Sequence, residues 1–455
     1  MALNSSKALL SINQRLPPEI LSEIFILCPT APMRITDAFL VERDISIPSH
    51  LHLTLVCKSW HSIVESTPEL WTSLKIYIPY RNIPQRIKDI QRWISRSGQL
   101  PLSITIHRHS SPPGEFSDSL MGDLVNLVKI HSHRWESLET TLAPELLRHF
   151  RDSIGSTSIL KTLLIFPPCR IMGSRREPFS IGSFPSPTCV SLNTGYIWPL
   201  GIYWDNVTRF TARYMGIGQT LEILRLSPQL QEFILFSLLR ENGANRLPSS
   251  PILHARLETL SIGYLPSGVL PYQLIDNMTL PSLKHLNITA FHLQNHSIID
   301  FLDRSECLLE TCSIHDVDVS EDAIIDLLFA MPHLETLTLD SKDITDTFLN
   351  ILAETAPVSS HLHGYPDGSF LPKLHSLKCI HWPLFSWSCL SVAFGFNESG
   401  RSKSLSSDRR PLRSFTVVQD VDDPYSPEAN DVAELQRLRE EGCIVDFVFG
   451  RVDLL

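Results

Sequence analysis

The sequence predicts an α/β protein (α+β overall) in which a small helical module precedes a curved array of strand–helix repeats. Two observations predict this class. First, a motif of the form Leu-x-x-Leu-x-Leu recurs with successive spacings of 27, 26, 26 and 25 residues, starting at Leu230, Leu257, Leu283, Leu309 and Leu334. Second, two apolar stretches with helical spacing lie within the first 71 residues, ahead of the regularly spaced motifs. One strand and one helix per period indicate units that stack on a shared core.

The first helical stretch is RLPPEILSEIFILCP, from Arg15 to Pro29. Its Pro-Pro-Glu run predicts a helix start, because proline is tolerated in the first turn and a carboxylate suits a helix N-terminus. The apolar residues of the stretch are Leu16, Ile20, Leu21, Ile24, Phe25, Ile26 and Leu27. This is more apolar surface than one amphipathic stripe needs. Periodicity alone leaves two interpretations open: the helix is buried within its own domain, or part of it contacts another protein.

The second helical stretch is LHLTLVCKSWHSIVESTPELW, in which apolar residues recur at helical spacing. These residues are Leu53, Val56, Cys57, Trp60, Ile63 and Val64. Pro68 opens a further turn, with Leu70 and Trp71 as buried anchors. From Leu74 onward, LKIYI predicts a strand, PQRIKDIQRWISRSG a helix closed by Gly98, and LPLSITIH a second strand. Strand, helix and strand in this order indicate a crossover unit with parallel strands.

The repeated motif has further, less regular copies, at Leu160, Leu374 and Leu412. Helical segments occupy several of the gaps, and Pro228 and Pro332 mark helix ends just before two strands. A period of 20 to 29 residues with one strand and one helix is the leucine-rich-repeat signature. The usual asparagine after each strand is absent, so other backbone contacts must satisfy the turns. We expect irregular insertions at 359–370 and 397–411.

These patterns divide the chain into four predicted segments. They are a flexible N-terminal tail at 1–14, a helical module at 15–73, a connecting α/β region at 74–150 and an irregular leucine-rich-repeat-like domain at 151–450.

Composition excludes several classes of function. The net charge of −10 lacks the basic excess that a nucleic-acid surface needs. The start has no apolar signal region, and no run approaches 18 apolar residues, so we expect neither secretion nor membrane insertion. Nine scattered cysteines without a signal peptide predict free thiols in a reducing compartment. We therefore expect a cytoplasmic or nuclear protein.

No motif predicts an enzyme. The sequence contains no phosphate-binding P-loop, dinucleotide turn, G-x-S-x-G or H-E-x-x-H motif. Cys57 with His61 four residues later has helical spacing, but a small buried thiol is the better interpretation. The pair His131 and His133 lacks the further ligands of a zinc site. We expect no catalytic residue, no metal and no cofactor.

Taken together, LPPEILSEIF, a spacer and LVCKSWHSIVESTPELW resemble the F-box family. Its typical members show Leu-Pro-x-Glu-Ile-Leu, an Ile-Phe pair, Val-Cys-Lys/Arg-x-Trp and Leu-Trp. This sequence supplies these elements as Leu16, Pro17, Glu19, Ile20, Leu21, Ile24, Phe25, Val56, Cys57, Lys58, Trp60, Leu70 and Trp71. The match covers about an eighth of the chain, and the spacer from Cys28 to His52 is longer than in a compact F-box.

The resemblance implies a receptor subunit of an SCF-type (Skp–cullin–F-box) ubiquitin ligase. The F-box would bind a Skp-family adaptor and, through it, a cullin-RING ligase, while the repeats would bind a protein substrate. By analogy, an apolar helix face would lie in a groove of the adaptor. The implied adaptor-binding residues are Leu16, Pro17, Glu19, Ile20, Leu21, Ile24, Phe25, Val56, Cys57, Lys58 and Trp60. A repeat scaffold without any ligase partner is the alternative.

Residues between the inward-facing leucines of the repeat strands form a second candidate surface. On stacked strands they would make a polar ribbon, either simply solvated or in contact with a substrate. The candidate substrate-binding residues are His285, Asn287, Thr311, His315, Thr336, Thr338, Asp340 and Lys378.

Overall fold

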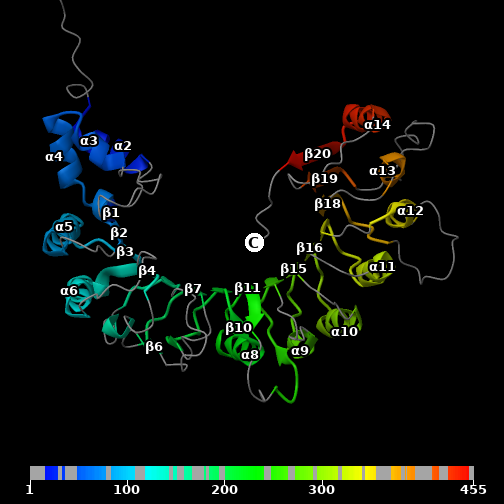
Figure 1. Cartoon of the computed structure of the whole chain (residues 1–455), viewed down its shortest axis with the longest axis horizontal. Coiled ribbons are helices and arrows are strands. Elements are labelled where there is room, and N and C mark those ends of the chain that lie inside the picture. Colours follow the sequence, from blue (N-terminus) through cyan, green and yellow to red (C-terminus); the bar gives the residue numbers. More distant parts are fainter. Residues whose placement is uncertain are drawn as a thin grey trace, which may run out of the picture. The chain divides into compact units, whose positions relative to one another are not determined.

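The fold comes from a computed structural model, in which most of the predicted elements can be followed (Figure 1). The residues that it describes are 16–28, 33–35, 49–77, 83–107, 118–142, 147–150, 158–166, 179–180, 184–193, 200–239, 247–264, 272–289, 295–315, 320–340, 344–354, 370–380, 385, 387–394, 412–419 and 429–449. The predicted tail 1–14 and insertion 397–411 lie outside these residues, as does the insertion 359–370 except for Phe370.

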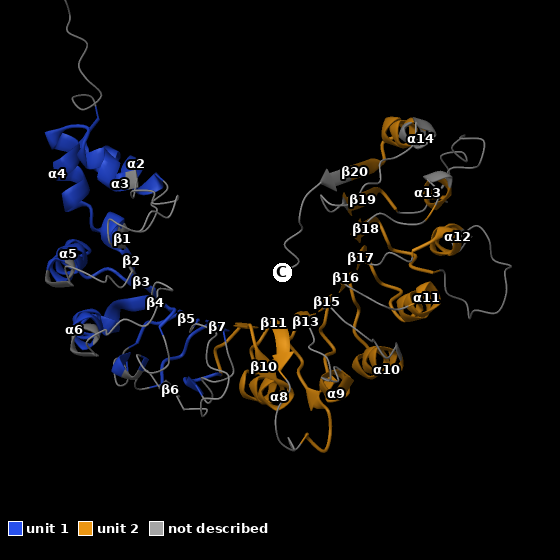
Figure 2. Ribbon diagram, viewed as in Figure 1, with its two compact units in different colours: residues 1–204 blue, residues 205–455 orange. Residues whose placement is uncertain are grey.

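The chain forms two compact units, residues 1–204 and residues 205–455 (Figure 2). This division has no signal in the sequence, where strand and helix segments alternate on both sides of it.

Unit 1 opens with the helical module that the sequence predicts. Its elements are α2 (Pro18–Leu27), β1 (Met33–Ile35), α3 (Ser49–Thr54), α4 (Lys58–Ser66) and the 3₁₀ turn η1 (Pro68–Trp71). Helix α2 begins directly after Pro17 and packs against α4 and η1. The second apolar stretch is not one continuous helix. It breaks at Leu55–Cys57, because Cys57 adopts an extended conformation and caps a new helix.

A parallel sheet continues unit 1, in the order β1-β2-β3-β4-β5-β7. The predicted strand, helix and strand after residue 73 are confirmed, and Gly98 follows the helix with a positive φ of 58°. The elements of this part are β2 (Ser73–Tyr77), α5 (Ile83–Arg96), β3 (Leu102–His107), α6 (Asp118–Lys129), η2 (Ser132–Arg134), β4 (Trp135–Thr140), η3 (Arg148–Phe150), β5 (Thr162–Ile165), β6 (Phe179–Ser180), β7 (Cys189–Leu192) and β8 (Leu200–Gly201).

Unit 2 is the regular part of the repeat array, with parallel strands in the order β9-β11-β13-β15-β16-β17-β18-β19-β20. The unit curves, with its strands on the inner side and α10 to α14 on the outer side (Figure 1). Its strands are β9 (Arg209–Ala212), β10 (Met215–Gly216), β11 (Glu232–Leu239), β12 (Ile252–Leu253), β13 (Thr259–Tyr264), β14 (Met278–Thr279), β15 (His285–Thr289), β16 (Thr311–His315), β17 (Thr336–Asp340), β18 (Ser376–Ile380), β19 (Ser414–Gln419) and β20 (Ile444–Phe449). Its helices are α8 (Ile217–Leu226), α9 (Tyr272–Ile275), α10 (Asn295–Ser305), α11 (Glu321–Phe329), α12 (Asp346–Glu354), α13 (Trp387–Ala393) and α14 (Ala429–Glu440).

Each copy of the leucine motif lies at the same place in its repeat. The strand begins two residues after the first leucine. The first, fourth and sixth positions are buried, as in Leu334 ahead of β17 and Leu337 and Leu339 within it. Side chains on a strand alternate between its two faces, so the fourth and sixth positions point to the helix side. No single repeat encloses these side chains, and stacking buries them. The predicted repeat array is confirmed.

One backbone contact recurs at the strand entries. The carbonyl of Glu258 accepts from both Lys284 N and His285 N, each at 2.9 Å, and the carbonyl of Lys284 accepts from Glu310 N and Thr311 N in the next repeat. The same double acceptance occurs at several further entries in unit 2 and before β7 in unit 1. It fixes the register of neighbouring repeats through the backbone, whatever side chains follow.

Gly263 marks a close backbone approach between two strands. A Cβ atom at this position would lie 2.4 Å from the carbonyl oxygen of Phe236 on β11. Glycine is therefore required where the ends of β11 and β13 come together.

Candidate docking site of the N-terminal module

Helix α2 presents two different faces. Leu21 and Phe25 are 3% and 1% exposed and form part of the core of the module. Ile20 and Ile24 lie one residue earlier, about 100° around the helix, and are 48% and 44% exposed. Leu27 continues this second face and is 83% exposed. The helix therefore has an apolar face that its own domain does not cover.

A second group of exposed apolar side chains lies where α3 gives way to α4. Leu55 and Val56 are 81% and 57% exposed. Cys57 follows them as the N-cap of α4, and its sulfur accepts the backbone N–H of Trp60 at 3.5 Å. The cap explains the cysteine, because a small polarisable side chain at this position satisfies one of the orphan amides of the helix.

The sequence-predicted docking residues thus separate by burial. Pro17, Glu19, Ile20, Ile24, Val56 and Lys58 are exposed, Leu16, Cys57 and Trp60 are half-buried, and Leu21 and Phe25 are buried. Phe25 packs on Trp60, with ring centroids 4.9 Å apart. Leu27 and Leu55 belong to the exposed apolar surface but were not in the predicted set. Both could have been included from the sequence, because Leu27 directly follows Ile26 and Leu55 directly precedes Val56 in the two apolar stretches.

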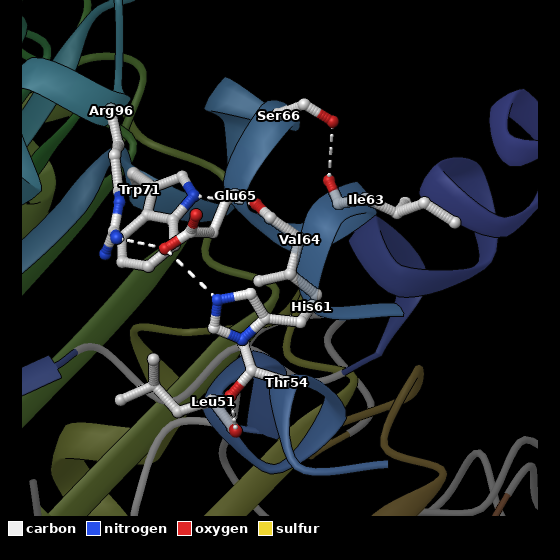
Figure 3. A network of polar contacts seen from close by, with 9 residues as sticks. All are labelled: Leu51, Thr54, His61, Ile63, Val64, Glu65, Ser66, Trp71 and Arg96. Atoms are coloured by element: carbon white, nitrogen blue, oxygen red, sulfur yellow. Dashed lines mark hydrogen bonds and ion pairs between the residues drawn. The ribbon is translucent and has the colours of Figure 1, made fainter. Parts of the chain in front are cut away.

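The module is joined to the first strand–helix unit by a polar network (Figure 3). Glu65 of α4 pairs with Arg96 of α5 and lies 3.5 Å from the ring of His61. The Arg96 guanidinium stacks on Trp71, 4.4 Å from the ring centroid, and Trp71 donates its indole N–H to the Val64 carbonyl at 2.9 Å. A stacked, hydrogen-bonded guanidinium holds its neighbours in a defined geometry. Helix α5 is thereby held against α4.

A buried histidine completes this junction. His50 of α3 is 1% exposed and lies between Trp71 and Trp93, with ring centroids 5.3 Å from each. Neither ring nitrogen has a hydrogen-bond partner among the described residues. Burial lowers the pKa of His50 to about 4, so the ring is neutral near pH 7.

The strand face of unit 2 carries two polar rows, defined here by the register of the paired strands. The first row consists of Thr259, His285, Thr311, Thr336, Ser376 and Ser414. The second row lies two residues further along each strand and consists of Ser261, Asn287, Ser313, Thr338, Lys378 and Thr416. Six of the predicted substrate-contact residues fall in these rows, where all six are half-buried.

The other two predicted contact residues lie deeper. His315 and Asp340 are 5% and 6% exposed, and His315 Nδ1 lies 3.7 Å from Asp340 Oδ2. They follow the alternation of the two rows, on β16 and β17, yet they are buried at the strand ends. The structure therefore places them inside the fold and not on its accessible surface.

The buried cysteines of the repeat strands have a packing role. Burial raises the pKa of the Cys312 and Cys379 thiols to about 12, so both pack as small apolar side chains. Within the described part of the chain, no group of three or more His, Cys, Asp and Glu side chains is placed to hold a metal ion. None of the described helices combines the length and the apolar character that crossing a membrane requires.

Comparison with known proteins agrees with this arrangement at its N-terminal end. Residues 13–77 match the family model described as F-box-like, which covers the module from before α2 to the end of β2. Among solved structures, a crystal structure of a protein from Bacteroides fragilis matches with 17% identity over 64% of this chain and 76% of that chain, at a TM-score of 0.28. None of the curated proteins compared with the chain matches it.

Proposed function

We propose that this chain, which carries an F-box-like domain ahead of a parallel-strand repeat array, is the substrate-binding subunit of an SCF-type ubiquitin ligase. In this role the F-box-like domain binds a Skp-family adaptor, and through it a cullin-RING ligase, while the repeats hold a protein substrate. The subunit is not catalytic. It acts by proximity, because tethering raises the effective concentration of the substrate near the ubiquitin-charged enzyme.

The observation that carries the proposal is the uncovered apolar face of α2. Ile20, Ile24 and Leu27 repeat at intervals of four and three residues on one side of a helix whose other side is anchored in the core. This is the pattern with which a helix enters an apolar groove of a partner. Fully burying one isoleucine or leucine contributes about 1.5–3 kcal/mol, so the face provides several kcal/mol before the costs of association.

Leu55 and Val56 extend the proposed contact to a second element. Both lie beside the start of α4, which packs against α2. Leu21 and Phe25 do not contact the partner in this proposal. They are buried and hold α2 on the module, so its outer face is available for binding without rearrangement. Of the residues that the resemblance implied, we assign contact to the exposed ones and support to the buried ones.

The alternative is a repeat scaffold that binds proteins without a ligase. Both functions would use the strand face of unit 2 to bind a protein. They differ only at the N-terminal module, which binds an adaptor in the ligase subunit and has no such partner in the scaffold. The uncovered face of α2 favours the ligase subunit, since a scaffold has no need of an exposed apolar helix ahead of its repeats.

A pulldown with matched variants separates the two functions. The full chain is expected to co-purify a Skp-family adaptor and a cullin, and Ile24→Asp is expected to lose both. The control is Ile159→Asp, which introduces the same charge at an isoleucine of similar exposure, 43% against 44%. If the wild-type chain retains no ligase subunit, or if Ile24→Asp retains as much as Ile159→Asp, the ligase role is refuted.

A further inference from the structure

The parallel sheet of unit 2 ends at strand β20, which lies at the last position of the array (Figure 1). On one side β20 pairs with β19 over six residues, from Ile444 opposite Ser414 to Phe449 opposite Gln419. On its other side, no strand among the described residues pairs with it. The outer edge of a terminal strand presents backbone N–H and C=O groups that another strand can bond.

A backbone contact at the start of β20 shows which of its residues face this outer edge. The N–H of Ile444 donates to the Arg413 carbonyl at 2.9 Å, so the backbone groups of Ile444 point toward β19. Successive residues of a parallel strand point their backbone groups to alternate sides. The N–H and C=O groups of Val445, Phe447 and Phe449 therefore point to the outer edge.

Arg439 occupies the first of these outward carbonyls. It lies in the last turn of α14, a helix that packs against β20. Its Nε donates to the Val445 carbonyl at 2.8 Å, and its Nη2 bonds the same oxygen. A neighbouring strand would place its own N–H donor about 2.9 Å from this oxygen. The guanidinium therefore takes the position that the backbone of a next strand would have.

The sequence of β20 makes an accessible edge a hazard. IVDFVF consists of five apolar residues and Asp446, and β-branched and aromatic residues favour strands. Ile444 is 55% exposed. Six-residue segments of this kind, with little charge and no proline, pair readily with one another when an edge is accessible. Proteins protect such edges with charged side chains, and Arg439 supplies one here.

The same edge of a second copy has the groups that would pair with β20. If two β20 strands run antiparallel about a two-fold axis, Phe447 of one copy and Phe449 of the other exchange N–H···O=C bonds, and symmetry repeats this pair. In this register Asp446 of one copy is not opposite Asp446 of the other, so no like charges face each other. The contact is self-complementary and closed, which limits it to two copies.

Arg439 opposes this pairing in two ways. It already bonds the Val445 carbonyl, for which a neighbouring strand would have to compete. An approaching strand would also shield the guanidinium from water, which is costly for a charge that gains no carboxylate partner. We infer that Arg439 guards the edge of β20, and that its removal allows two copies of the chain to pair through this strand. The inference concerns a part of unit 2 that adaptor binding does not use.

Size-exclusion chromatography with light scattering, at increasing concentrations of the full-length chain, tests the guard. We expect the wild type at the monomer mass and Arg439→Ala at twice that mass. Arg439→Lys, which keeps a charged donor, should remain monomeric. The control Arg413→Ala removes an exposed arginine directly before the neighbouring strand and should also remain monomeric. Equal masses for the wild type and Arg439→Ala, or a dimer of Arg413→Ala, overturn the inference.

Backbone methylation shows whether β20 is the contact. Residues 1–442 with Arg439→Ala are ligated at Cys443 to a synthetic peptide of residues 443–455, with or without an N-methyl group on Phe447. The methyl group removes an outward N–H and leaves the hydrogen bonds to β19 in place. We expect the methylated chain at the monomer mass and the unmethylated chain at twice that mass, and equal masses contradict the inference. If circular dichroism shows that Arg439→Ala is unfolded, Arg439→Gln, which removes the charge and keeps an amide donor, replaces it with the same expectation.

Discussion

At the scale of single residues, neighbouring side chains in the N-terminal module have opposite roles. Leu21 is buried and Ile20 beside it is half exposed, although both are aliphatic and both belong to the same motif. Cys57 caps a helix, although its spacing alone suggested one more buried position. Residue type therefore identifies the module, and only the packing assigns each residue to the core or to the surface.

His50 makes the stability of the module depend on pH. Its pKa is about 4 in the folded state and about 6.5 in the unfolded chain, so the unfolded state binds the proton first as the pH falls. The contribution of His50 to the free energy of unfolding is therefore largest above pH 6.5. It is lost as the pH falls from 6.5 to 4, by about 3 kcal/mol in total. Urea unfolding followed by tryptophan fluorescence at pH 7, 5.5 and 4 measures this decrease. His50→Phe, which keeps a ring but cannot titrate, should show a weaker pH dependence, and an equal dependence in both proteins argues against it.

Glu321 connects two successive repeats through one carboxylate. It accepts from Thr345 N at 2.7 Å, from Thr345 Oγ1 at 2.6 Å and from Phe348 N at 3.1 Å, and so caps α12 from the start of α11. We expect Glu321→Ala to lower the free energy of unfolding of unit 2 by about 1–3 kcal/mol. Asp326→Ala, on the exposed side of α11, should change it by less than about 0.5 kcal/mol. Chemical denaturation of the two variants gives the comparison, and equal effects contradict the capping role.

At the scale of elements, the buried face of α2 contributes to stability, and its exposed face is the one proposed to bind the adaptor. Leu21→Ala removes a core side chain and is expected to cost about 2–5 kcal/mol in the free energy of unfolding. Ile24→Ala, on the exposed face, is expected to change that free energy by less than about 0.5 kcal/mol while weakening adaptor binding. Thermal unfolding and an adaptor pulldown on both variants measure the two quantities. A large loss of stability in Ile24→Ala shows that the face is already used within the chain.

The leucine motif predicts some of the repeat strands and misses others. Every strand that carries Leu-x-x-Leu-x-Leu, or a close copy, was predicted at its observed position. Strands β4 and β9 have the same buried positions but fill them with Trp135, Leu138, Val207 and Phe210 among others, so a search for leucines does not find them. Burial only requires apolar side chains of suitable volume, and it does not require leucine.

The candidate sites were predictable in type and less so in detail. The order of Leu-Pro, Val-Cys-Lys-x-Trp and Leu-Trp was sufficient to predict an F-box-like module, and residues 13–77 match that family model. The break at Leu55–Cys57 was not predicted, because helical spacing of apolar residues continues through it. His315 and Asp340 were predicted on the surface from strand alternation. Alternation gives the face of a sheet but does not report what covers the ends of its strands.

At the scale of the whole molecule, one chain carries two candidate binding surfaces. Unit 1 carries the F-box-like domain with its uncovered apolar helix face, and unit 2 carries the polar strand face. The network of Glu65, Arg96 and Trp71 fixes the domain to the first strand–helix unit that follows it. The proposed receptor role needs this attachment, since the end that we propose to bind the adaptor must be continuous with the folded array.

Isothermal titration calorimetry of a purified Skp-family adaptor into the full-length chain tests the central claim most directly. We expect a 1:1 complex with a negative heat-capacity change, because the contact buries the apolar side chains of α2. The double variant Ile20→Asp/Ile24→Asp should bind at least about a hundredfold more weakly, since each buried charge costs more than a kilocalorie. The control Ile130→Asp/Ile159→Asp, at two other exposed isoleucines of unit 1, should bind like the wild type. Absence of binding by the wild-type chain, or equal affinities for both double variants, would contradict the account.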